Sequence, residues 1–129
     1  MLYEEYVKIT QQVNQSVENK DYETALRLLE DLVQSDLPDI DKSFMCINLA
    51  VVWDKAGNSI ETLRAYDRAI RLETPHHRCF AHEEKASYLV QMKRREEAAA
   101  IYQDLLNKSF LTLNDQERIR ANLKAVENS

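Results

Sequence analysis

The stretch LAVVWDKAGNSIETLRAYDRAI, residues 49–70, contains the only glycine of the chain, Gly57. Apolar residues recur at helical spacing on both sides of it, and Asn58 or Ser59 can cap a new helix directly after it. Glycine takes the left-handed position at the end of a helix without the steric penalty of a side chain. The stretch therefore predicts a helical hairpin that reverses at Gly57, which we interpret as a structural residue.

The overall composition also favours helices. A chain of 129 residues has one glycine and two prolines, whereas folds rich in strands and tight turns need many of both. Ala, Leu, Glu, Lys, Arg and Gln are abundant, and these residues form helices well. The length and the 44% hydrophobic content are typical of one globular domain with a real core. We expect helices joined by short loops.

Charge and cysteine content narrow the class of partner. The formal net charge of −5 disfavours binding to phosphate backbones. The longest apolar-rich run, residues 44–53, is too short to span a bilayer, and the first residues do not resemble a secretory signal. Two cysteines are too few for a disulfide framework. We expect a cytoplasmic protein with reduced thiols that binds neither nucleic acid nor membrane.

Helical periodicity runs through almost the whole chain. It predicts seven helices, with Asp21 capping the second and Pro38 following the end of that helix. The last helix is predicted to open at Asn114 with Glu117 as its capping-box partner. The third helix is apolar nearly all round, so it should be covered on most sides. The predicted segments are hairpins at about 2–34, 40–72 and 77–107 and a capping helix at about 114–127.

The second helices of the three hairpins resemble one another. The segments DYETALRLLEDL (21–32), NSIETLRAYDRA (58–69) and RREEAAAIYQDL (94–105) align at offsets of 37 and then 36 residues. A fixed period in this range is typical of a solenoid of helical hairpins. Three columns of small or apolar residues coincide: Ala25, Thr62 and Ala98; Leu29, Tyr66 and Tyr102; and Leu32, Ala69 and Leu105.

The middle repeat resembles a tetratricopeptide repeat (TPR). Its pattern comprises Cys46, Leu49, Ala50, Trp53, Gly57, Thr62, Tyr66, Ala69 and Pro75. The resemblance covers about residues 6–110 and is weaker at both ends, where Gln12, Ser16, His82 and Lys85 replace expected apolar residues. It implies an all-α fold: a right-handed α-solenoid of three TPR-like hairpins with a C-terminal capping helix, forming a single domain over residues 1–129.

The resemblance also implies a function. TPR stacks bind partners on a concave face lined by the first helix of each repeat, so we expect a protein-protein interaction module that binds a peptide or protein segment, apolar at its anchors and basic at its edge. Alternatively, the apolar residues of this face belong to the core, or they are covered by the C-terminal segment or by a second copy of the chain in a homodimer. The predicted groove residues are Thr10, Asn14, Phe44, Ile47, Asn48, Val51, Lys55, Phe80, Glu83, Glu84 and Ser87.

One known TPR ligand class is excluded by the residues at hand. In the family's carboxylate clamp, two asparagines act with several cations, and Asn14 and Asn48 fall on the asparagine positions. Thr10, Phe80 and Glu84 fall where cations are required. A carboxylate ligand facing Glu84 without a cation would be repelled.

Other chemistry is weakly signalled. His76, Cys79 and His82 are spaced three apart and would share a helix face as metal ligands could, but structural zinc needs four ligands, so we expect no metal. The basic residues Lys93, Arg94 and Arg95 are offset by neighbouring glutamates, as on a solvated helix surface. No glycine-rich phosphate loop, nucleophile elbow or HExxH motif is present, so we expect no cofactor and no catalysis.

Overall fold

The computed structural model describes residues 1–129 and consists of helices alone, with 79% of the residues helical and no strand. This confirms the predicted all-α class. The elements are α1 (Tyr3–Glu18), α2 (Tyr22–Val33), α3 (Asp39–Lys55), α4 (Ser59–Glu73), the 3-10 helix η1 (Thr74–His76), α5 (Phe80–Gln91), α6 (Arg95–Leu106) and α7 (Leu113–Glu127). None of these helices has both the length and the apolar character needed to traverse a lipid bilayer.

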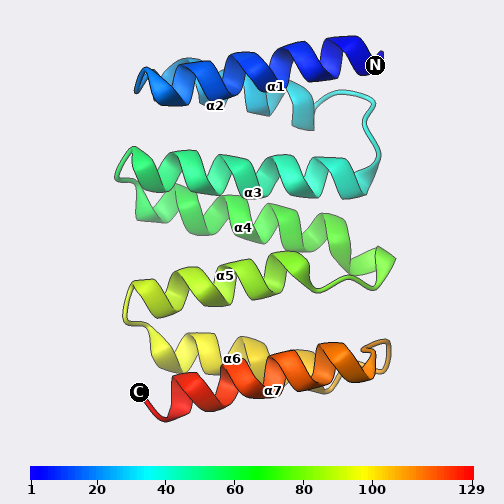
Figure 1. The fold of residues 1–129 in the computed structure, drawn as a ribbon, viewed down its shortest axis with the longest axis vertical. Coiled ribbons are helices and arrows are strands. Elements are labelled where there is room, and N and C mark those ends of the chain that lie inside the picture. Colours follow the sequence, from blue (N-terminus) through cyan, green and yellow to red (C-terminus); the bar gives the residue numbers. More distant parts are fainter. The chain divides into compact units, whose positions relative to one another are not determined.

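The chain forms two compact units, residues 1–76 and residues 77–129. In the first unit α1 packs on α2, α2 on α3 and α3 on α4, while η1 packs on the end of α4. In the second unit α5 packs on α6 and α6 packs on α7. Figure 1 shows these neighbouring helices side by side within each unit. Contacts therefore follow chain order, as the short connections between helices require.

The repeated columns found in the sequence lie in the core. All nine residues, Ala25, Thr62, Ala98, Leu29, Tyr66, Tyr102, Leu32, Ala69 and Leu105, are buried. The small residues of the first column allow helices to approach closely. The Thr62 hydroxyl is accommodated because it donates to the Asn58 carbonyl at 2.8 Å. Burying one large side chain of these columns contributes roughly 1.5–3 kcal/mol.

The three turns within the helix pairs have the same backbone geometry. Lys20, Gly57 and Lys93 are left-handed, with φ of 59°, 82° and 61°. The amide of the following residue donates back five residues in each case, at 2.8 Å from Asp21 to Ser16, 3.0 Å from Asn58 to Trp53 and 2.8 Å from Arg94 to Leu89. Together with the shorter bond made by the left-handed residue, this is the Schellman ending of a helix.

Helix α3 is covered on most sides, as its composition predicts. It lies between α2 and α4, and its buried residues include Met45, Cys46, Leu49, Ala50 and Val52. The buried Ser43 hydroxyl donates to the Ala69 carbonyl of α4 at 3.0 Å, so this polar group keeps a hydrogen-bond partner when it is buried.

Side-chain caps begin two helices at the predicted residues. Asp21 accepts a hydrogen bond from the Thr24 amide, and Asn58 accepts one from the Glu61 amide. A further polar link joins α4 to α2, because Arg68 donates through both Nη atoms to Glu30 at 2.8 Å.

Two predicted helix starts are wrong. The fifth helix begins at Phe80 rather than at His77, because residues 74–76 form η1 and His77 then takes a left-handed φ of 55°. The last helix begins at Leu113 with Thr112 as its cap. The capping box pairs Thr112 with Asp115, not Asn114 with Glu117, since Thr112 is the residue with extended backbone and a hydroxyl aimed at the third amide.

Candidate functional site

Two hollows contain predicted groove residues, one in each unit. The hollow of the first unit, called the N-terminal hollow, has a volume of about 360 Å³. Its lining comprises Thr10, Val13, Asn14, Val17 and Glu18 of α1, Leu29 of α2, and Asn48, Val51, Val52 and Lys55 of α3. Five predicted residues, Thr10, Asn14, Asn48, Val51 and Lys55, are thus brought together.

Helical spacing places these side chains on the walls of the N-terminal hollow. Thr10 and Asn14 are four residues apart on α1, and Asn48 and Val51 are three apart on α3, so each pair shares a helix face. The Thr10 hydroxyl is occupied, since it donates to the Val7 carbonyl at 2.8 Å. The amides of Asn14 and Asn48 are exposed and form no hydrogen bond within the protein. Two unused amides therefore flank an apolar floor.

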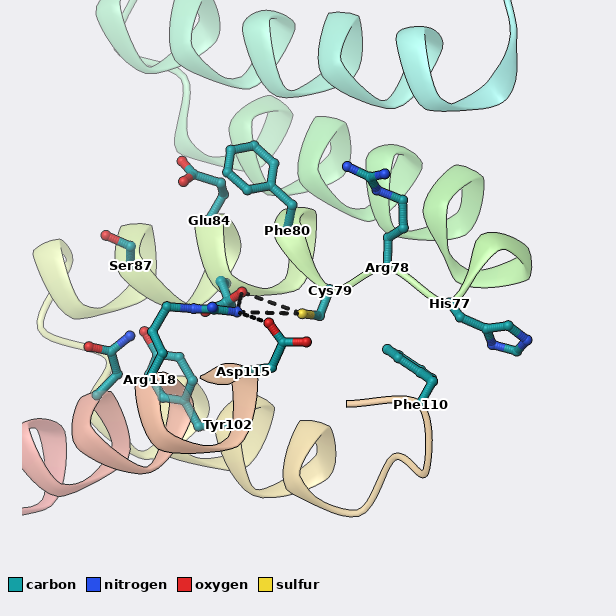
Figure 2. A pocket seen from close by; sticks show the side chains of 12 residues that line it. His77, Arg78, Cys79, Phe80, Glu84, Ser87, Tyr102, Phe110, Asp115 and Arg118 are labelled. Carbon is teal, nitrogen blue, oxygen red and sulfur yellow. Dashed lines mark hydrogen bonds and ion pairs between the residues drawn. The ribbon is translucent and has the colours of Figure 1, made fainter. Parts of the chain in front are cut away.

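The hollow of the second unit, called the C-terminal hollow, has a volume of about 640 Å³. Figure 2 shows that its walls come from the segment entering α5, from α5 itself, and from α6 and α7. Its lining comprises His77, Arg78, Cys79, Phe80, Glu83, Glu84, Ser87, Tyr102, Phe110, Asp115, Arg118 and Asn122. Four predicted groove residues, Phe80, Glu83, Glu84 and Ser87, are among them.

The guanidinium of Arg118 links α7 to α5 across this hollow. Its Nε donates to Glu83 Oε1 at 2.8 Å and its Nη2 to Glu83 Oε2 at 2.9 Å, which makes a two-pronged ion pair. Nη2 also donates to Asp115 Oδ1 at 3.0 Å. The Cys79 thiol donates to Glu83 Oε2 at 3.4 Å. In Figure 2 the dashed lines of this network meet around Arg118.

The network shifts the protonation of its members. Burial, reinforced by the nearby Glu83 carboxylate, raises the pKa of the Cys79 thiol to about 12. Hydrogen bonds from the Thr112 backbone and then from Arg118 lower the pKa of Asp115. Burial and then the charge of Glu83 raise the pKa of Glu84, whose carboxylate forms no hydrogen bond or ion pair. Cys79 is therefore a neutral thiol at pH 7 and a poor nucleophile.

The remaining predicted groove residues, Phe44 and Ile47, line neither hollow. Ile47 is only 7% exposed, so it offers a partner little surface, whereas Val51 one turn later on α3 is 41% exposed. Phe44 is among the exposed large apolar side chains.

The histidine and cysteine spacing produces no metal centre. No group of three or more His, Cys, Asp or Glu side chains is arranged to hold a metal ion. The three residues would share a face only on one continuous helix, but the left-handed His77 and the non-helical Cys79 separate His76 from α5. His76 instead contacts Asp39, with 3.1 Å between Nε2 and Oδ2.

Two arginines of the basic segments are paired with nearby acids. Arg64 pairs with Glu61 and Arg94 with Glu97, each three residues apart on exposed helix surface. Such pairs contribute little stability because water screens them. The exposed helix surface around these pairs therefore carries charges of both signs and is not a continuous basic surface.

Sequence reasoning missed the contribution of α6 and α7 to the C-terminal hollow. The repeat pattern places Tyr102 in the core, and the pattern of the last helix predicts only a cap, so neither points to Asp115 or Arg118 as site residues. The Thr112-x-x-Asp115 spacing is a capping-box signal that places Asp115 at the start of a helix. No local signal in the sequence pairs Arg118 with Glu83, 35 residues away.

Comparison with known proteins gives no family. A scan of the sequence against models of protein families finds no match, and a search of the curated proteins finds none either.

Proposed function

We propose that this protein is a protein-protein interaction module without catalytic activity, built as a right-handed α-solenoid of three TPR-like hairpins and a capping helix. Three features support the TPR-like interpretation. The repeat columns are all buried, the three turns share one Schellman geometry, and the middle repeat carries the TPR residue pattern. A fold of this kind suits binding, but the site itself must carry the functional argument.

The observation that carries the proposal is the pair of unused amides in the N-terminal hollow. Asn14 on α1 and Asn48 on α3 each offer one acceptor and two donors to a ligand. An extended peptide presents alternating backbone donors and acceptors, which such amides match. Val51, an exposed apolar residue of the same lining, offers a contact for one apolar side chain of the peptide.

The test uses peptides selected for binding to the full chain from a random display library. We expect Asn14→Ala and Asn48→Ala each to weaken binding of the selected peptides about five- to tenfold, the value of one lost hydrogen bond. Gln12→Ala is the matched control, because Gln12 is an exposed amide of α1 outside the hollow, and it should change the Kd less than about twofold.

Two results would contradict the proposal. Either the library yields no binder, or the selected peptides bind all three variants with wild-type affinity. Circular dichroism at 222 nm establishes that each variant keeps its helical content.

A second candidate function is self-association, with the exposed apolar surface of α3 buried by another copy of the chain. Phe44 and Val51 of α3 are both exposed, and exposed apolar surface on a helix favours such a contact. Sedimentation velocity over a concentration range tests this candidate. A dimer that Val51→Arg dissociates supports it, and a monomer at the highest concentration excludes it.

We also propose a cytoplasmic setting. Cys46 and Cys79 are both free thiols. Unpaired buried cysteines are typical of reducing compartments. Localisation of a tagged full-length protein in its native cell checks this.

A further inference from the structure

The C-terminal hollow holds a bound guanidinium that comes from the chain itself. Arg118 donates two parallel hydrogen bonds to Glu83, at 2.8 and 2.9 Å, and one to Asp115 at 3.0 Å. This fork geometry is specific for arginine, because a lysine ammonium cannot make both parallel bonds. The occupied carboxylates thus identify the kind of group that this surface of α5 binds.

The two partners of this ion pair differ in how much they need each other. The Glu83 side chain is 16% exposed and the Arg118 side chain 45% exposed. A largely buried carboxylate requires a cation nearby, since burying an uncompensated charge is costly. The more exposed Arg118 guanidinium can instead be hydrated when it leaves Glu83. An incoming arginine could therefore replace Arg118 at Glu83. An incoming anion would instead have to draw Arg118 away, which would leave the Glu83 carboxylate without a cation.

The charges around the pair favour a second cation. Glu83, Glu84 and Asp115 all line the hollow, and Arg118 is the only basic group bonded to any of them. Arg78 also lines the hollow, but in Figure 2 its side chain extends away from Arg118 and Asp115. Glu84 has no ion-pair partner, and its raised pKa indicates that its charge is poorly solvated.

The hollow also has room and apolar surface for the rest of a side chain. Its volume of about 640 Å³ lies within the range of known ligand sites. Phe110, which is only partly buried, contributes aromatic surface, and Ser87 and Asn122 contribute neutral polar groups that can bond a peptide backbone.

We propose that Glu83, Glu84 and Asp115 form a binding site for an arginine side chain of a protein partner, and that Arg118 occupies this site in the free protein as an internal competitor. The site lies wholly within residues 77–129 and does not depend on the N-terminal hollow. Its test uses different variants, so either proposal can fail without the other.

The experiment measures binding of a short peptide to the ¹⁵N-labelled full chain by NMR titration. The probe is acetyl-Ala-Leu-Arg-Leu-Ala-amide, and its comparison peptide carries citrulline, the neutral analogue of arginine, at the central position. We expect saturable shifts in the amides of residues 79–87 and 113–118 with the arginine peptide, and much weaker binding of the citrulline peptide.

The decisive variants remove the competitor. Arg118→Gln should lower the Kd of the arginine peptide about threefold, because it vacates the carboxylates. Arg120→Gln is the charge-matched control. Arg120 lies on the same helix, is outside the lining of both hollows described above and bonds Gln116, so its replacement should change the Kd less than about 1.5-fold. Glu84→Gln should raise the Kd about threefold, and the exposed Glu117→Gln should leave it nearly unchanged.

Three outcomes would overturn the proposal. In the first, Arg118→Gln binds the arginine peptide no more tightly than Arg120→Gln does. In the second, the citrulline peptide binds as well as the arginine peptide. In the third, Arg118→Gln shows no saturable shift up to about 10 mM peptide, the range of single exposed ion pairs. If Arg118→Gln loses the dispersed amide signals of α7, Arg118→Lys takes its place. It keeps the charge but not the two-pronged bond, and its Kd should again fall below that of Arg120→Gln.

Discussion

The three equivalent turns allow one prediction with a built-in comparison. Gly57, Lys20 and Lys93 occupy the same left-handed position of the same Schellman ending, yet only one of them is glycine. A left-handed residue with a side chain costs about 1–2 kcal/mol. A glycine avoids this cost, but it also raises the conformational entropy of the unfolded chain, which offsets roughly 0.4–1 kcal/mol of the gain. The net advantage of glycine at each position should be about 1 kcal/mol.

The magnitude at Gly57 follows from the backbone alone. A Cβ built on Gly57 would meet no heavy atom within 4 Å, so Gly57→Ala creates no clash and only its φ of 82° is unfavourable. We expect Gly57→Ala to lower the free energy of unfolding by about 1 kcal/mol and the midpoint temperature by roughly 4 °C. Lys20→Gly and Lys93→Gly should raise the free energy of unfolding by about the same amount.

The assay is urea unfolding followed by circular dichroism at 222 nm, with Lys8→Gly as the control. Lys8 is exposed in the middle of α1, where the same lysine-to-glycine change should destabilise by about 1 kcal/mol. The same substitution thus has opposite signs at residues 8 and 20. Destabilisation by Lys20→Gly comparable to that of Lys8→Gly would refute the reasoning.

The remaining predictions concern the second unit. Thr112→Ala should cost about 1 kcal/mol of stability through loss of the cap, while Asn114→Ala should cost less than about 0.5 kcal/mol, as judged by thermal unfolding. Glu84→Gln should stabilise the protein at pH 7, because burial and the charge of Glu83 raise the folded-state pKa of Glu84 and make its ionised form unfavourable. The gain in the free energy of unfolding should shrink as the pH falls through that raised pKa, because the wild-type carboxyl also becomes neutral there. Iodoacetamide at pH 8 should modify Cys79 far more slowly in the folded protein than in 8 M urea, because the folded-state pKa of about 12 leaves almost no thiolate; equal rates, followed by mass spectrometry, would contradict this.

Helix starts illustrate how far local sequence signals reach. Asp21 and Asn58 cap the helices predicted for them, because each side chain bonds an amide three residues away in its own segment. The predicted start of α5 is wrong because His77 takes a left-handed backbone, with its ring 5.3 Å from that of Phe110. Phe110 lies 33 positions later, and no local pattern reveals its proximity. The predicted start of α7 is wrong although the sequence contains the correct signal, since two capping boxes overlap there and the one at Thr112 forms.

The sequence by itself determined the helical class, the turns and the buried columns of this protein. These depend on interactions between residues within one or two helical turns, and on apolar periodicity that must face a core wherever that core lies. The tertiary structure alone decided which exposed residues share a hollow. It buries Ile47 but leaves Val51 exposed on the same helix, and it brings Arg118 of α7 to Glu83 of α5 across 35 residues. Such contacts depend on how whole helices pack, and the spacing of residues along the chain does not specify that packing.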